Sequence, residues 1–115
     1  MPEPLIRGRP PRSTAVALLQ AQGLPVSDIT DGHLEHFFFA GSDGSPTGLV
    51  GLEIYGSDAL LRSLVVADSA RTQGVGSALV QHAEDYAVSN NVATMYLLTT
   101  TAESFFERRG YRRAA

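Results

Sequence analysis

The sequence predicts a single α/β domain over residues 1–115, built on a mostly antiparallel sheet with one parallel junction. Three strand patterns follow one another between positions 34 and 66, and only short turn segments separate them. A long amphipathic helix pattern then leads to a further strand. Because a helix of this length suits a crossover between parallel neighbours, we expect the last strand beside the third one. A chain of 115 residues has room for one hydrophobic core.

The first half of the chain predicts a helix followed by an antiparallel meander. After a short extended start at Leu5 and Ile6, Ser13 is expected to cap a helix that ends at Gly23. Residues 24–32 are mixed, with room for one extra turn of helix. The strands of the meander are expected over residues 34–40, 48–55 and 59–66.

The second half predicts a helix, a strand and a short helix. Apolar side chains recur at helical spacing over residues 74–89. Residues 93–99 have the pattern of a strand. Thr100 and Glu103 have the spacing of a capping box, which opens a short helix that closes at Gly110. Helices are therefore expected to flank the sheet.

The composition excludes several kinds of chemistry. The chain has no Cys, and all nine basic residues are Arg. These absences exclude a Schiff-base lysine, a Walker-type phosphate loop, a disulfide framework and a thiolate nucleophile. The net charge of -3 argues against a nucleic-acid partner that is bound by phosphate neutralisation. No apolar run suits a membrane helix and the start does not resemble a signal peptide, so we expect a cytoplasmic protein without a membrane partner.

The motif that carries chemistry lies between the third strand and the long helix. Residues 71–78 there are Arg-Thr-Gln-Gly-Val-Gly-Ser-Ala. Free backbone N–H groups at a helix start can bind phosphate, and glycines let the ligand approach the main chain. Such main-chain donors need no lysine. The alternative interpretation is that Gly74 and Gly76 only form the turn between strand and helix.

In this position the segment resembles the pyrophosphate loop of the GNAT acetyltransferases. Its pattern of Gln or Arg, then Gly, then Gly or Ala is met by Arg71, Gly74 and Gly76. A second motif of the family begins at an Asn and ends in a Gly that an aromatic residue follows. This sequence matches the later positions of that motif at Ala102, Phe105, Gly110 and Tyr111. The runs 60–66 and 96–106 are similar, more narrowly, to a bacterial branch of arsenic-resistance N-acetyltransferases.

The resemblance implies an acetyl-coenzyme A-dependent N-acetyltransferase that moves an acetyl group to the amine of a small molecule by direct attack. Acetyl-coenzyme A would lie where the strands 59–66 and 93–99 splay apart, with its pantetheine arm paired to the first of them. The cofactor-binding positions that the resemblance implies are Leu64, Val65, Val66, Arg71, Gln73, Gly74, Val75, Gly76, Ser77, Thr99 and Phe106.

Two positions depart from the family's pattern. The tyrosine that often protonates the leaving thiolate falls on Phe106, and the strand glutamate that often acts as base falls on Leu60. Glu53 and Arg62, each in the middle of an apolar strand, are candidate catalytic substitutes. Glu53 would act as the base or bind the amine, and the guanidinium group of Arg62 would bind a carboxylate or an oxyanion through two hydrogen bonds. Alternatively the two face solvent or pair across the sheet, and the protein is a catalytically weakened coenzyme A-binding or interaction module.

Other polar residues are weaker candidates. His33 and His36 have no recognisable third ligand beside them, so no metal site is expected. Tyr55, Tyr96 and Tyr111 are possible acids, with packing as the favoured role for each.

The end of the chain departs from the family as well. The resemblance implies two further strands after Tyr111, yet few residues follow it. We expect a domain that is truncated at its C-terminus, lacks the last strand and leaves a strand edge open. An open apolar edge favours pairing with another chain, which predicts a homodimer or a strand-exchanged assembly. A frayed, truncated gene product is the alternative.

Overall fold

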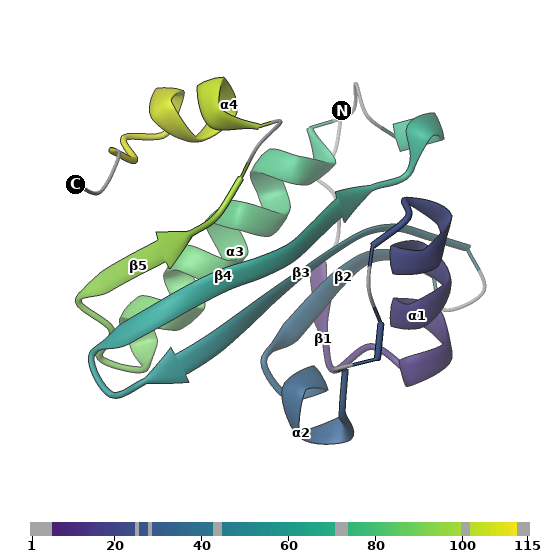
Figure 1. Ribbon diagram of the computed structural model, residues 1–115, viewed down its shortest axis with the longest axis horizontal. Coiled ribbons are helices and arrows are strands. Elements are labelled where there is room, and N and C mark those ends of the chain that lie inside the picture. Colours follow the sequence, from purple (N-terminus) through teal and green to yellow (C-terminus); the bar gives the residue numbers. More distant parts are fainter. Residues whose placement is uncertain are drawn as a thin grey trace.

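The computed structural model describes residues 6–24, 26–27, 29–42, 45–70, 74–99 and 102–112. Its strands form one sheet in chain order, antiparallel from β1 to β4 and parallel between β4 and β5. This arrangement confirms the predicted meander and the predicted parallel junction (Figure 1). The strands are β1 (Ile6–Gly8), β2 (Phe37–Ser42), β3 (Ser45–Tyr55), β4 (Asp58–Val66) and β5 (Thr94–Leu97).

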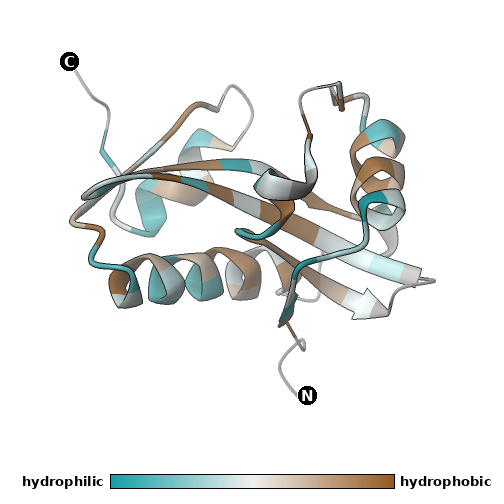
Figure 2. Ribbon diagram, turned by 90° about the horizontal axis from the view of Figure 1, so that it is seen from below, coloured by the Kyte–Doolittle hydropathy of each residue, from teal (hydrophilic) through white to brown (hydrophobic). Residues whose placement is uncertain are grey.

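Helices cover both faces of the sheet. The helical elements are α1 (Arg12–Ala21), α2 (Asp31–Leu34), the 3-10 turn η1 (Asp68–Ala70), α3 (Val75–Ser89) and α4 (Glu103–Arg108). α1 and α2 pack against one face, and α3 and α4 share the core of the other. Figure 2 shows α3 lying along one side of the sheet and α1 on the opposite side. Within the described residues, no helix combines the length and apolar character needed to cross a membrane.

β3 supplies side chains to both layers of the core. Leu49 packs with the α1 layer and is fully buried, whereas its neighbour Val50 is fully buried in the α3 layer. Successive side chains of a strand point to opposite faces, and a strand covered on both faces is apolar throughout. In the α3 layer, Leu79 and Val80 are also fully buried. α3 is therefore packed against the sheet through its buried apolar side chains.

The first helix begins earlier than the sequence predicts. Pro11 holds the N-cap position of α1 with a φ of -55°, and Ser13 lies inside the first turn. The prediction that Ser13 caps this helix is therefore wrong, because the fixed φ of proline already suits a helix start. The predicted end is confirmed, since Gly23 follows α1 with a φ of 71°.

The second strand begins later than predicted, because a turn of helix takes its first residues. The Thr30 hydroxyl accepts a hydrogen bond from the His33 N–H at 3.3 Å. The Thr30 N–H donates in return to His33 Nδ1 at 3.2 Å. This capping box starts α2, so β2 begins at Phe37 and not at position 34.

Gly51 marks the tightest contact between β3 and the α1 layer. A methyl group there would lie 2.3 Å from Phe37 Cε1, and Phe37 is fully buried. We expect Gly51→Ala to lower the free energy of unfolding by about 1–3 kcal/mol in urea denaturation, because the ring must shift. Gly8→Ala is the matched control: its methyl would meet Phe38 at 3.6 Å, and we expect a change below about 0.5 kcal/mol. Equal stabilities would contradict this view of the core.

Candidate functional site

The parallel ladder between β4 and β5 is short. Its Cα pairs run from Asp58 and Thr94 to Leu61 and Leu97. β4 continues beyond this point to Val66 while still paired with β3. Figure 1 shows the teal β4 running on after the yellow-green β5 has ended. The two strands therefore separate after Leu61, as the resemblance stated above implies.

A bulge in β4 lies immediately beyond that point. Arg62 pairs with Gly51 and Val65 with Leu49, so two residues of β4 oppose one of β3. The first of these two residues, Ser63, has a φ of 59°, in the left-handed region. The bulge changes which face of the sheet the following side chains of β4 occupy. Arg62 therefore lies on the α1 face, whereas Leu64 packs with the α3 layer. We did not predict this bulge; the only signal for it is a polar Arg-Ser pair within an apolar strand.

The start of α3 faces the splayed part of β4. Gly74 holds the N-cap position with a φ of 74°, and no side chain of the described residues caps the helix. Its first turn contains no acidic residue, so the positive end of the helix dipole is not neutralised there. Arg71 and Gln73 lie outside the described residues, and their predicted contacts stay predictions.

A cavity with a volume of about 450 Å³ lies between the end of β4, the start of α3 and α4. The structure thus brings together five of the predicted binding residues, which line this cavity: Leu64, Val66, Gly74, Gly76 and Ser77. Val65 and Val75 are buried in the core, at 6% and 3% exposure. Only their main-chain groups are therefore available to a ligand.

The second wall of the cavity comes from α4 and was not predicted. It consists of Ala102, Ser104, Phe105 and Arg108. The last three follow helical spacing and so share one face of the helix. That spacing is the signal in the sequence that could have identified them. No acidic side chain lines this cavity among the described residues.

Phe106 and Thr99 lie beside the cavity and not in it. Phe106 is 5% exposed and packs edge-on against Phe105 and Tyr111. The Thr99 hydroxyl accepts a hydrogen bond from the Ala102 N–H at 3.0 Å, directly before α4. Both residues line a second cavity of about 480 Å³ along β5. Their predicted contacts with a cofactor stay predictions.

Glu53 and Arg62 form an ion pair on the α1 face of the sheet. Arg62 Nη1 donates to Glu53 Oε2 at 2.5 Å, and the Tyr55 hydroxyl donates to Glu53 Oε1. Arg62 Nε also donates to Ser63 Oγ at 3.2 Å, which connects the pair to the bulge. The side chains of Arg62 and Glu53 are 21% and 18% exposed. The cross-strand pairing that the sequence left open as an alternative is therefore present.

The hydrogen bonds to Glu53 set its protonation. Those from Tyr55 and then Arg62 hold the pKa of Glu53 below its ordinary value of 4.5. The same interaction raises the pKa of Tyr55, which therefore keeps its proton at neutral pH. A carboxylate that accepts hydrogen bonds at both oxygens is a weak base. The pair is thus better suited to binding charged groups than to removing a proton.

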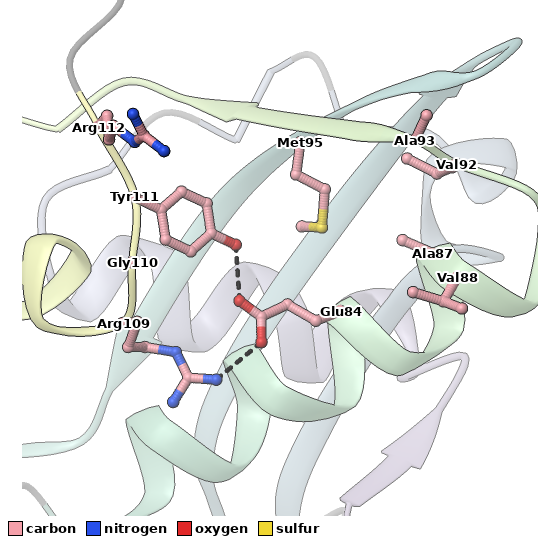
Figure 3. Close-up of a pocket in the computed structure, with 10 residues that line it drawn as sticks. All are labelled: Glu84, Ala87, Val88, Val92, Ala93, Met95, Arg109, Gly110, Tyr111 and Arg112. Atoms are coloured by element: carbon pink, nitrogen blue, oxygen red, sulfur yellow. Dashed lines mark hydrogen bonds and ion pairs between the residues drawn. The ribbon is translucent and has the colours of Figure 1, made fainter.

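Tyr111 has a structural partner on α3. Its hydroxyl donates to Glu84 Oε2 at 2.8 Å, and Arg109 Nη2 binds Glu84 Oε1 at 2.8 Å (Figure 3). Burial and the Glu84 carboxylate raise the pKa of Tyr111 far above its ordinary value. These contacts fasten the end of α4 to α3. Tyr111 is therefore a packing residue, which is the role that the sequence favours.

His33 and His36 have different partners. The ring of His33 belongs to the capping box of α2, whereas His36 Nδ1 lies 2.8 Å from the Tyr86 hydroxyl. Among the described residues, no three His, Asp or Glu side chains gather as metal ligands.

A comparison with models of protein families identifies the family to which the chain belongs. The model of the acetyltransferase (GNAT) family matches residues 10–111. The chain belongs to the GNAT family. It is similar to an uncharacterized N-acetyltransferase of Chlorobaculum tepidum, with 33% identity over 81 residues, or 70% of this chain and 52% of that protein. The chain thus spans about half the length of this GNAT relative.

Solved structures share the fold. N-acetylglutamate synthase from Neisseria gonorrhoeae, complexed with coenzyme A and L-arginine, matches with a TM-score of 0.86 and 21% identity, over 100% of this chain and 28% of that one. The ribosomal-protein-S18-alanine N-acetyltransferase from Escherichia coli matches with a TM-score of 0.80 and 20% identity, over 96% of this chain and 79% of that one. The GNAT fold predicted from the sequence is confirmed.

Proposed function

We propose that the protein is an acetyl-coenzyme A-dependent N-acetyltransferase that acts on the amine of a small molecule. The observation that carries this proposal is the cavity at the splayed end of β4, which combines open strand edge with uncapped helix amides. Strand edges bind extended amide-containing chains, and helix starts bind phosphate. Coenzyme A has both features, in the pantetheine arm and the diphosphate.

Acetyl-coenzyme A would bind with its diphosphate on the first amides of α3 and its pantetheine arm along β4 at Leu64. Membership of the GNAT family supports this placement. The residues present fit the ligand, because the cavity walls at Gly74 and Gly76 carry no side chain and the described lining has no acidic group.

The proposed reaction is direct transfer. The neutral amine nitrogen attacks the thioester carbonyl carbon, while a main-chain N–H of β4 stabilises the developing oxyanion. The carbon–sulfur bond then breaks, the sulfur leaves as a thiol with a proton, and the amine loses its proton through water. No covalent enzyme intermediate forms. This route needs neither a glutamate at Leu60 nor a hydroxyl at Phe106.

The acceptor would bind at Glu53 and Arg62. These side chains lie on the α1 face at the point where β4 and β5 separate, so they flank the thioester from the side opposite α3. Glu53 would hold the ammonium form of the acceptor before it loses its proton, and Arg62 would bind a carboxylate or the oxyanion. An amino acid carries both groups. The narrower resemblance to the arsenic-resistance branch remains a hypothesis that the acceptor is a toxic amino-acid analogue.

The second candidate function is a catalytically weakened coenzyme A-binding or interaction module. It is favoured by the lowered pKa of Glu53 and by the buried Phe106, since neither supplies an acid or a base. Acetyl-coenzyme A should raise the melting temperature in both cases. Only the enzyme releases free thiol when a panel of amines, including amino acids, is added. No thiol release with any amine would favour the module.

Gly76 offers a test of the cofactor site. A methyl group there would make an ordinary contact, 3.5 Å from Val66 Cγ2, so the free protein can accept it. We expect Gly76→Ala to keep or raise the melting temperature, because alanine favours a helix. The same methyl group would occupy space that the diphosphate needs, and should weaken acetyl-coenzyme A binding roughly tenfold in calorimetry. Unchanged affinity would contradict the proposed placement.

The acceptor site is tested by Glu53→Gln and Arg62→Ala. With an amine that the wild type acetylates, we expect kcat/KM to fall roughly 10-fold to 100-fold, mainly through KM for the amine, since charge-assisted contacts are lost. Glu35→Gln, at the exposed end of α2, is the matched control. If both variants turn over like the wild type, the assignment of Glu53 and Arg62 is wrong.

We also propose that two copies pair along β5. This strand lies at the edge of the described sheet; Tyr96 within it is 50% exposed and Leu98 directly after it is 94% exposed. Light scattering at tens of micromolar should give twice the mass of 12.3 kDa. Leu98→Glu should yield monomers without changing the far-ultraviolet circular dichroism. A wild-type monomer would refute the pairing.

A further inference from the structure

α4 divides its charged side chains between two cavities. Arg108 lines the cavity at the start of α3, together with Ser104 and Phe105 on the same helix face. Glu103 and Glu107 line the separate cavity along β5. The described lining of the first cavity therefore includes one cation and no carboxylate. An anion is the ligand that this distribution favours.

The two adjacent arginines of α4 have different environments. Arg109 donates to Glu84 at 2.8 Å and to Gln81 Oε1 at 3.3 Å, and so fastens α4 to α3. Arg108 is exposed, and no described residue forms a hydrogen bond or ion pair with it. Its guanidinium group is thus available to a ligand in the cavity.

We propose that Arg108 binds the diphosphate of coenzyme A, opposite the first amides of α3. This inference rests on the proposed function and adds a phosphate-binding side chain from a different element. A guanidinium group can donate two parallel hydrogen bonds to phosphate oxygens, and the chain has no lysine that could supply the charge instead. The diphosphate is favoured over the 3′-phosphate because Arg108 shares its cavity with Gly74, Gly76 and Ser77.

The test is Arg108→Ala in the full chain, with affinity measured by calorimetry for three ligands. We expect the Kd for coenzyme A to rise roughly 10-fold to 100-fold, the range of a charge-assisted hydrogen bond. The Kd for 3′-dephospho-coenzyme A should rise by the same factor, because this ligand keeps the diphosphate. Binding of pantetheine, which has no phosphate, should not change. Arg108→Lys should recover part of the lost affinity for both nucleotides.

Arg112→Ala is the matched control, because Arg112 is also exposed but lines only the cavities away from the start of α3. It should bind all three ligands as the wild type does. Unchanged coenzyme A affinity in Arg108→Ala would overturn the inference. An equal loss of affinity for pantetheine would also overturn it, because such a loss would mean that the side chain only supports the cavity by packing. A loss confined to coenzyme A would assign Arg108 to the 3′-phosphate and overturn the diphosphate contact. Failure of the wild type to bind coenzyme A would instead refute the proposed function.

Discussion

The early end of the parallel ladder between β4 and β5 is the constraint on which the site depends. A parallel pair needs a crossover, so α3 must begin beyond the carboxyl end of β4 and return along the sheet. Because β5 stops at Leu97 while β4 runs on to Val66, no strand of the described residues fills the space beside the last residues of β4. The helix start therefore opens onto strand edge. The bulge at Ser63 adds a change of face, which places Arg62 and Leu64 on opposite sides of the sheet.

Local signals in the sequence were sufficient for most of the helices and strands and for the turn at Gly74 and Gly76. The periodicity of α3, the meander and the pair Gly74 and Gly76 are properties of neighbouring residues, and each was predicted close to its observed position. Non-local features were predicted less completely: the parallel junction was expected, whereas the pairing of Glu53 with Arg62 was one of several alternatives and the bulge was missed. The bulge at Ser63 depends on how β4 pairs with β3, and the contact between Glu53 and Arg62 depends on that register. The start of α2 was missed because His33 acts where a capping box normally has Glu or Gln.

The ion pair between Glu53 and Arg62 is compatible with both a structural and a binding role. About a fifth of each side chain is exposed, so solvent screens the pair and its net contribution to stability is small. An acceptor that carries an ammonium and a carboxylate would replace the ion pair between Glu53 and Arg62 with two ion pairs, one from each side chain to the acceptor. The exchange keeps every charge compensated. Tyr55 would hold Glu53 in place during it, since its hydrogen bond uses the other carboxylate oxygen.

Three glycines differ in why a side chain is absent. At Gly51 a methyl group would overlap the buried ring of Phe37, and at Gly74 the φ of 74° disfavours any other residue. Neither reason applies to Gly76, where the described chain leaves room for a methyl group. Glycine in the first turn of a helix is less stable than alanine, so the folded chain alone gives no advantage to this choice. A phosphate bound by the first amides of α3, as proposed above, would approach the main chain at Gly76 and would account for a residue without a side chain there.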